Sequence, residues 1–207
     1  MTAFSKLFFN RLLRPLAIVL VAASLGGCGA IIAQNPSGSF SPVNAVADDP
    51  ESRLLLKGAD VVAYFTQGRF VQGSPQFRSS YQGVDFRFAS AEHKALFDKS
   101  PGQYLPQYGG YCANGLVYGI PWGGDADAWK MIDGKVYIFG GQGSMDAFMI
   151  DPKKNISLAD RYWQDEVQGS NSFIQRSRRL VFKVPHYQSG SDLAKAVADA
   201  KKQGILK

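Results

Sequence analysis

The chain has few of the residues from which catalytic and metal sites are usually built. Among its 207 residues are two cysteines, Cys28 and Cys112, and two histidines, His93 and His186. It contains no CxxC pair, no phosphate-binding Walker loop, no HExxH helix and no GxSxG nucleophile motif. A structural zinc site needs four ligands, which these scattered residues do not supply. The motif-defined ATPases, zinc proteases and serine hydrolases are therefore disfavoured.

The N-terminus also lacks an apolar run long enough to span a bilayer, which takes about 20 residues. The apolar stretch over residues 15–25 follows three basic residues and ends at Gly26-Gly27-Cys28. A basic start, a short apolar stretch and small residues are the parts of a secretory signal. Leu25-Gly26-Gly27-Cys28 resembles the bacterial lipobox, so residues 1–27 are predicted to be a lipoprotein signal peptide. The alternative is an ordinary secreted protein with a chance cysteine at this position.

Acylation of Cys28 would hold the mature chain on a membrane, since each buried CH₂ contributes about 0.8 kcal/mol. By the usual sorting pattern of lipoproteins, Gly29 rather than Asp after the cysteine favours the outer membrane. We therefore expect a lipid-anchored protein of the cell envelope that faces the periplasm. Anchoring removes Cys28 from other chemistry and leaves Cys112 as the single free thiol, so no intramolecular disulfide is expected.

The basic surplus is smaller than it first looks. The precursor has 23 basic and 17 acidic residues, a formal charge of +6. The predicted signal contains three of the basic residues, which leaves 20 against 17, or +3, for the mature chain. This surplus does not indicate a nucleic-acid partner. The densest cluster, Arg176, Arg178 and Arg179, is interpreted as a solvated face, with contact to an envelope protein partner as the alternative.

The mature chain is expected to be a small single α+β domain with additions at both ends. Residues 28–53 are rich in small and polar residues and contain prolines, which predicts a flexible tether. Residues 54–165 are expected to form the domain. Residues 166–207 are expected to be a C-terminal extension with a basic segment, a strand over 180–184 and a helix over 191–202 capped by Ser191.

Within the domain, two hairpins and several packed helices are expected. Residues 81–88 predict a strand pair around a glycine-containing turn, with Phe86 and Phe88 on one face. Asp133-Gly134 lies between two alternating apolar runs, which is typical of a type I′ hairpin turn. Ser90 is the expected N-cap of a helix that buries Leu96 and Phe97. Further helical segments are expected from residue 144 and after Asp151-Pro152.

Taken together, these stretches resemble the YHS-domain family, in its secreted bacterial group with a Tyr-Gly-Gly-Tyr-Cys or Tyr-Gly-Gly-Phe-Cys core. The matching segments are residues 58–65, 73–77, 86–93, 96–97, 101–104, 106–113 and 129–137, and they span about residues 55 to 165. Members are described as metal-binding modules, and some of the secreted group carry selenocysteine at the cysteine position. The resemblance therefore implies redox or soft-metal chemistry at Cys112. The chain departs from the pattern by having a single cysteine there.

Cys112 is the leading candidate site residue, and it follows Gly109 and Gly110, which permit a tight turn. Three tyrosines surround it in the sequence, Tyr104, Tyr108 and Tyr111. A thiolate suits a copper or zinc ion and is a nucleophile when its pKa is lowered. The alternative is a buried structural cysteine. His93 is considered as a second metal ligand, with an ordinary helix histidine as the alternative.

Other candidates have weaker support. Met145 and Met149 share a helix face and could offer thioethers to copper, but core packing is favoured. Asp125 and Asp127 could bind a hard cation, although the calcium-loop pattern is absent and a solvated loop is favoured. His186 lies outside the resemblance and is not favoured as a ligand.

Three functions follow from these observations. The first is a non-enzymatic, membrane-tethered binding module for a soft transition metal at Cys112. The second is a thiol-redox protein that works through a sulfenic acid or a mixed disulfide. The third is an envelope interaction domain in which Cys112 is only part of the core.

Overall fold

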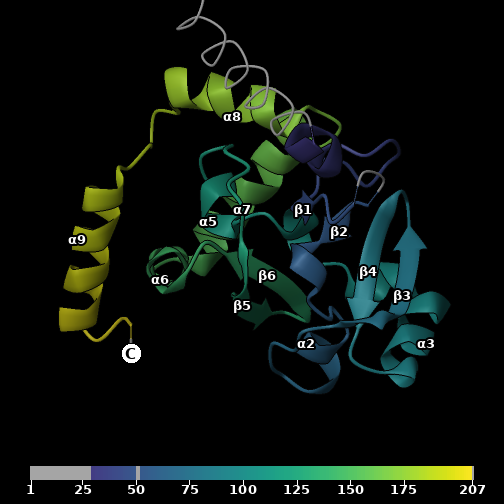
Figure 1. Cartoon of the computed structure of the whole chain (residues 1–207). Coiled ribbons are helices and arrows are strands. Elements are labelled where there is room, and N and C mark those ends of the chain that lie inside the picture. The colour runs from purple at the N-terminus through teal and green to yellow at the C-terminus, as the bar shows by residue number, and fades with distance from the viewer. Residues whose placement is uncertain (1–28, 50–51, 207) are drawn as a thin grey trace, which may run out of the picture.

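In the part of the chain that the structure describes, the strands form two small sheets, and helices pack around both (Figure 1). The computed structural model describes residues 29–49 and 52–206. The first sheet has the order β1-β2-β4-β3, and the second is the hairpin of β5 and β6. This arrangement confirms the expected α+β class. The strands are β1 (Ala45–Val46), β2 (Leu54–Leu55), β3 (Ser74–Tyr81), β4 (Val84–Phe88), β5 (Asp125–Ile132) and β6 (Lys135–Phe139).

Helices lie between the strands along the chain and after the last described strand, β6. Residues 29–34 are also helical. Short 3-10 turns cover Leu56–Gly58 and Gln107–Gly110, and a π-helical turn covers Trp163–Val167. The helices are α2 (Ala63–Thr66), α3 (Ala91–Lys99), α4 (Pro101–Tyr104), α5 (Ala113–Leu116), α6 (Gln142–Met149), α7 (Pro152–Tyr162), α8 (Ser172–Val181) and α9 (Gly190–Lys202). None of the helices in the described ranges is long and apolar enough to cross a membrane.

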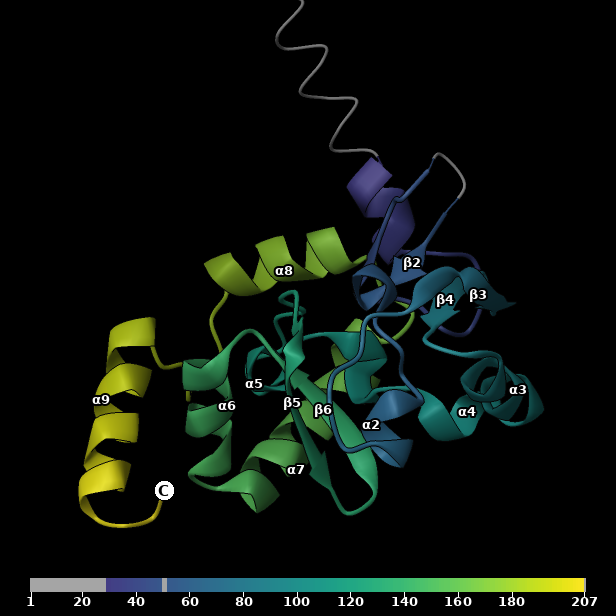
Figure 2. The ribbon, with the colours of Figure 1, turned by 60° about the horizontal axis from the view of Figure 1, so that its bottom comes forward.

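Strand β6 separates two hydrophobic clusters, because side chains alternate between the two faces of a strand. Val136 and Ile138 point into the cluster formed with the first sheet, α2 and α3. Tyr137 and Phe139 point into a second cluster with α5, α6 and α7. Figure 2 shows these helices on one side of the β5–β6 hairpin and the first sheet on the other. All four residues are buried, so β6 is covered on both faces.

Both expected hairpins are confirmed. Val84 follows β3 after the two-residue turn Gln82-Gly83, and Phe86 and Phe88 lie buried on one face of β4. Asp133 and Gly134 join β5 to β6 with φ values of 49° and 73°. Two consecutive positive φ values are what a type I′ turn requires, and its twist matches that of the strands.

The helix caps are confirmed in part. Ser90 caps α3, since its Oγ accepts a hydrogen bond from the His93 backbone N–H at 3.3 Å. Phe97 is buried as expected, but Leu96 is 38% exposed, which the sequence pattern had not predicted. The cap of α9 is Ser189 rather than Ser191, because Ser189 and Asp192 form a reciprocal capping box.

The expectation of a flexible tether over residues 28–53 is wrong for the residues that the structure describes there. Val43 and Ala45 are buried, and β1 pairs with β2 in the first sheet. The Asn44 side-chain amide donates to the carbonyl of Gly110 at 3.0 Å and to that of Gly124 at 2.8 Å. These residues complete the core. The tether prediction failed because a segment of mostly small and polar residues can still bury its few apolar side chains.

The expected strand over 180–184 is also wrong. Residues 172–181 form α8, which Asn171 caps by accepting hydrogen bonds from the backbone N–H groups of Phe173 and Ile174. Residues 182–184 are not in a strand. The cap and the sequence Ser172–Val181, with no proline or glycine, favour the helix over a short isolated strand.

The Asn44 contacts predict that this segment contributes to stability. Asn44→Ala removes both donors and leaves the carbonyls of Gly110 and Gly124 without them. We expect the free energy of unfolding to fall by about 1–3 kcal/mol in urea titrations. The control is Ser39→Ala, which removes an exposed hydrogen bond to Gln82 and should cost less than about 0.5 kcal/mol. Equal, small effects of both changes would show that residues 43–46 are not an integral part of the fold.

Candidate ligand-binding site

Two left-handed backbone turns face each other near the centre of the molecule. Leu56, Lys57 and Gly58 have φ values of 47°, 54° and 83°, and Tyr108 and Gly109 have 55° and 60°. Residues other than glycine seldom adopt this backbone conformation. Each such residue destabilises the fold by about 1–3 kcal/mol. Such outliers gather at ligand clamps and active sites, and the first of these turns lines a cavity through Leu56 and Lys57.

Asn44 joins the two turns. Its backbone N–H donates to the carbonyl of Gly109 at 2.8 Å, and its own carbonyl accepts from the Leu56 N–H at 2.9 Å. The side-chain amide then holds Gly110 and the start of β5 at Gly124. The segment from the predicted tether, the turn at residue 57 and the beginning of β5 are therefore fixed relative to one another.

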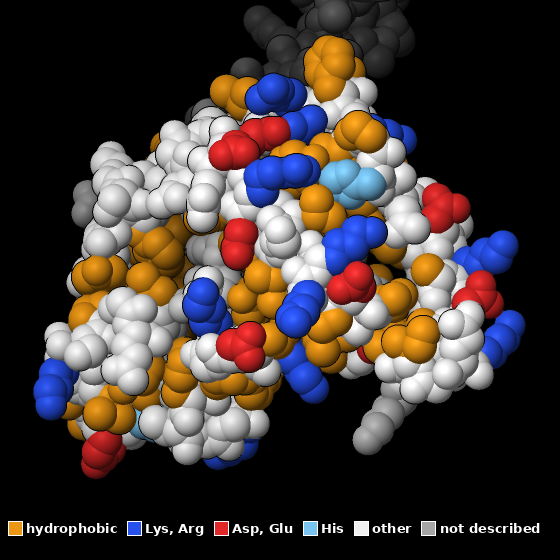
Figure 3. Space-filling model, turned by 180° about the vertical axis from the view of Figure 1, so that it is seen from behind, with side chains coloured by type: hydrophobic (Ala, Val, Ile, Leu, Met, Phe, Trp, Pro, Cys, Tyr) orange, Lys and Arg blue, Asp and Glu red, His pale blue; other side chains and the backbone are white. Residues whose placement is uncertain are grey.

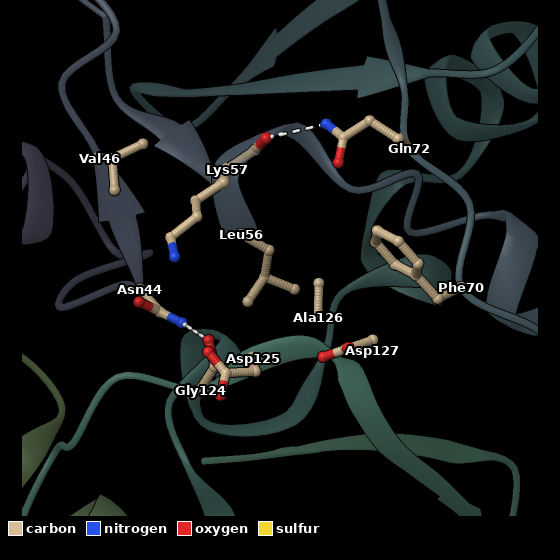
Figure 4. A pocket seen from close by; sticks show the side chains of 10 residues that line it. All are labelled: Asn44, Val46, Leu56, Lys57, Phe70, Gln72, Gly124, Asp125, Ala126 and Asp127. Atoms are coloured by element: carbon tan, nitrogen blue, oxygen red, sulfur yellow. Dashed lines mark hydrogen bonds between the residues drawn. The ribbon is translucent and has the colours of Figure 1, made fainter. Parts of the chain in front are cut away.

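A cavity of about 370 Å³ opens beside Asn44. Its floor is apolar and includes Leu56 and Ala126, and its rim is polar (Figure 4). The full lining consists of Asn44, Val46, Leu56, Lys57, Phe70, Gln72, Gly124, Asp125, Ala126 and Asp127. A concave apolar surface with a few polar groups at its edge is the usual form of a small-molecule site.

Three charged side chains stand on opposite walls of this cavity. In Figure 4 the Lys57 side chain extends toward Asn44 from one wall, and Asp125 and Asp127 lie along the other. The two acids are two residues apart on β5, so they project from the same face of the strand. Lys57, Asp125 and Asp127 take part in none of the ion pairs formed within residues 29–49 and 52–206. Their charges are thus available to a ligand.

Two further groups set the shape of the cavity. Gln72 donates to the carbonyls of Lys57 and Gly58 at 3.0 and 3.1 Å and so stabilises the left-handed turn. The Tyr64 hydroxyl donates to the carbonyl of Ala126 at 2.6 Å behind the wall. Burial raises the pKa of Tyr64, and the negative charges of Asp127 and Asp60 raise it further, so this hydroxyl stays a donor.

Cys112 lies on the other side of this wall. Its Sγ is 3.0 Å from the Ser144 Oγ of α6, and its backbone N–H donates to the carbonyl of Trp122. The residue is 4% exposed and packs against the backbone of Gly140. Gly109 forms the turn before it at a place where a Cβ would lie 2.6 Å from the carbonyl oxygen of Pro42. The glycines of the Tyr-Gly-Gly-Tyr-Cys core therefore permit close packing.

The structure does not bring His93 to Cys112. His93 lies on α3, whereas Cys112 contacts α6, and the two helices lie on opposite sides of the β5–β6 hairpin in both ribbon views (Figures 1 and 2). The Nδ1 atom of His93 is 2.6 Å from an oxygen of Asp60, and Nε2 is 3.1 Å from the Thr66 Oγ. Asp60 is fully buried and also accepts from three backbone N–H groups, those of Val62, Ala63 and Ala89.

The remaining candidates are mostly structural. Met145 and Met149 pack against the second core cluster, as favoured from the sequence. His186 lies against the Tyr118 and Tyr162 rings, and its Nε2 is 2.9 Å from the carbonyl of Val117. The surrounding tyrosines are buried in the core, and burial raises the pKa of Tyr111 to about 12 despite the nearby Ser172 and Arg176.

Among the residues that the structure describes, no second soft metal ligand lies beside the Cys112 thiol. The hydrogen-bonding neighbour of its thiol is a hydroxyl, and His93 belongs to a different cluster. The part of the chain that the structure describes contains no group of three or more His, Cys, Asp or Glu side chains able to hold a metal ion. Cys28 lies outside the described residues.

Comparison with known proteins identifies no relative: no family model, no curated protein and no solved structure matches the chain. The site therefore has to be interpreted from its own geometry. Sequence reasoning noted Asp125 and Asp127 but missed Asn44, Lys57 and Gln72. A sequence signal for these three is weak, because their roles come from left-handed backbone and from contacts between distant segments.

The buried Asp60 carboxylate yields a stability prediction. Asp60→Asn keeps the shape but turns one acceptor oxygen into an NH₂ group facing N–H donors. We expect the free energy of unfolding to fall by about 2–4 kcal/mol, because buried donors lose their partner. Urea titration measures this, with Asp98→Asn as control. Asp98 lies in an exposed ion pair with Lys94, which should contribute less than about 1 kcal/mol. A larger loss in the control than in Asp60→Asn would contradict this assignment.

The burial of Cys112 predicts slow thiol chemistry. In acylated protein carrying Lys135→Cys, a disulfide reagent should react in two phases. The exposed new thiol reacts first, and Cys112 follows at least about 100-fold more slowly, because it waits for local opening. Absorbance of the released thiol gives both rates in one sample. Rates within tenfold of each other would show that Cys112 is accessible and would restore the redox and soft-metal hypotheses.

Proposed function

We propose that the protein is a membrane-tethered binding module of the cell envelope that takes a small diamino acid in the cavity beside Asn44. The observation that supports this is the placement of Lys57 on one wall and Asp125 and Asp127 on the other, with none of the three in an ion pair within the described residues. Lipid on Cys28 would keep the module at the membrane, with the outer membrane favoured by Gly29.

Binding is favoured over catalysis by the chemistry of the lining. None of the ten lining residues is a histidine, cysteine, serine, threonine or tyrosine. The cavity thus offers charge and hydrogen-bonding groups that can hold a ligand, but its lining has no Ser–His or Cys–His pair of the kind that activates a hydroxyl or thiol nucleophile. A rim of amides and charges around an apolar floor is suited to orienting a flexible polar molecule.

The charges of the cavity define the class of ligand. Two carboxylates and one ammonium group are matched by a molecule with two ammonium groups and one carboxylate. Lys57 would receive the carboxylate, and Asp125 and Asp127 the two amines. A hard divalent cation is less suited, because the Lys57 ammonium lies in the same cavity and would repel it. The apolar floor at Leu56 and Ala126 would contact the methylene chain between the charges.

A soft metal or a redox role at Cys112 has less support. The thiol is buried, its neighbour is Ser144, and the expected second ligand His93 is elsewhere. Titration with Cu(I) and Zn(II) under anaerobic conditions tests the metal alternative directly. A site tighter than about 1 μM that Cys112→Ser removes would favour the metal over the diamino acid.

The ligand proposal is tested by calorimetry with a matched set of probes. L-Lysine has all three charges, L-norleucine lacks the side-chain ammonium, and 1,5-diaminopentane lacks the carboxylate. We expect L-lysine to bind with a Kd below about 1 mM and the other two at least tenfold more weakly, since each lost charge leaves a partner unpaired.

Variants locate the site. Lys57→Gln and Asp127→Asn should each weaken L-lysine binding about tenfold or more, because each removes one charge contact. Asp133→Asn makes the same charge change as Asp127→Asn. It lies at the tip of the β5–β6 hairpin, outside the cavity, and should leave binding unchanged. Equal binding of the three probes, or binding of Ca²⁺ without L-lysine, would overturn the proposal.

A further inference from the structure

Helix α8 packs with its polar face toward the protein. Ser172 and Gln175 are buried, and Gln175 donates to the carbonyl of Gly119 at 3.1 Å and to Glu166 at 2.9 Å. Arg176 donates to the carbonyl of Pro121 at 2.9 Å, and Arg179 forms an ion pair with Glu166. The basic cluster is therefore only partly solvated, because two of its three arginines hold the helix on the domain.

The charge of Glu166 strengthens this attachment. Its burial alone would raise the pKa of the carboxyl group, but hydrogen bonds from Arg179 and Gln175 outweigh the burial and lower it. Glu166 is thus ionised at neutral pH and holds α8 through both side chains. These contacts fix which face of α8 lies against the domain, and therefore which face points away from it.

That outer face is apolar. Phe173 is 54% exposed, Ile174 66%, Leu180 45% and Val181 74%, and the adjoining Phe182 is 67% exposed. Residues 173, 174, 177, 180 and 181 follow the spacing of one helix face. In an ordinary surface helix this stripe faces the core and the polar residues face water. Here the order is reversed, and a contiguous apolar surface of this kind marks an interaction site.

Basic side chains accompany the apolar stripe. Arg178 and Lys183 are exposed beside it. Figure 3 shows apolar and basic side chains next to each other along the upper edge of the molecule, where α8 lies in Figure 1. Apolar residues flanked by Lys and Arg are the composition of segments that lie in the interface of a bilayer with anionic lipid.

The N-terminal helix of residues 29–34 brings the predicted lipid-bearing end of the chain to this face. Gln34 accepts hydrogen bonds from Arg176 at 3.2 Å and from the Ser172 hydroxyl at 3.3 Å. Asn35 accepts from the Ser172 backbone N–H at 2.8 Å. Gly29 lies five residues before Gln34, which is about 7.5 Å along a helix axis. Cys28 precedes Gly29 in the sequence. Ile32 on this helix is 52% exposed.

We propose that the surface formed by the outer face of α8, Phe182 and Ile32 docks onto the lipid bilayer that anchors Cys28. The inference rests on the lipid anchoring in the proposed function, and it is independent of the ligand in the cavity. A bilayer is favoured over a protein partner because Gln34 contacts Ser172 and Arg176 of α8, and Gly29, the residue after the predicted acylation site, is five residues from Gln34 in the sequence. The packed segment 29–46 would then seat the domain on the membrane.

The test uses acylated full-length mature protein in vesicles that contain anionic and zwitterionic lipids. A fluorophore sensitive to its environment is attached through Val181→Cys, and in a matched variant through Lys135→Cys at the start of β6. The label at position 181 should be quenched by lipid-borne quenchers and be at least about fivefold less accessible to aqueous iodide than the label at 135. Wild type treated with the same fluorophore measures any labelling of Cys112.

Substitutions in the same face add a second measurement. Val181→Asp should reduce the immersion of a label attached through Phe173→Cys, whereas Leu96→Asp makes the same change at an exposed leucine of α3 and should have no effect. Since both residues are exposed, urea titration should show that neither variant is unfolded.

The possible failures are separable. Mass spectrometry that finds acyl chains on Cys28, together with equal iodide access at positions 181 and 135, would overturn the docking surface and leave the anchor intact. Absence of acyl chains would overturn the anchoring, and the docking surface would then require the unacylated chain to bind anionic vesicles in a way that Val181→Asp prevents. A label shielded from both quenchers in a protein of doubled mass would assign the surface to a second copy instead.

Discussion

The hydrogen bonds of Asn44 are the constraint on which the cavity depends. Its backbone links the turn at Gly109 to that at Leu56, and its side chain adds Gly110 and Gly124. These groups come from segments separated by as many as 80 positions in the sequence. Without Asn44, their carbonyls and N–H groups would need other partners in a region that is largely buried, and such unsatisfied groups are costly.

The same contacts stabilise backbone that is unfavourable by itself. Leu56, Lys57 and Tyr108 adopt positive φ, and each costs about 1–3 kcal/mol. Burial of Leu56 and the hydrogen bonds of Asn44 and Gln72 offset this cost. Two adjacent residues of the turn therefore have different roles. Leu56 is buried in the core, and Lys57 presents its charge to the cavity. Strain therefore places a cation where an extended segment would not.

Local features of the fold were predictable, because local sequence determines them. The Asp133-Gly134 turn and the Ser90 cap each depend on the conformational preferences of a few neighbouring residues. Asp125 and Asp127 were also recognised as a pair. Their partner Lys57 and the connecting Asn44 were not, because proximity over dozens of residues leaves no pattern in one sequence. The two glycines before Cys112 permit the tight turn that was expected there.

The incorrect strand at residues 180–184 has a physical cause that bears on α8. A run of apolar residues indicates that their side chains are removed from water. In a soluble domain the place where this happens is the core. Leu180, Val181 and Phe182 belong to the run that was predicted to form a strand. In the structure they are exposed, while the polar side chains Gln175 and Arg179 face the protein. If a bilayer is the second apolar environment, the same run needs no place in the core. The contacts of Gln34 and Asn35 with α8 place the start of the described chain beside this apolar run, which supports the bilayer as the apolar phase that receives it.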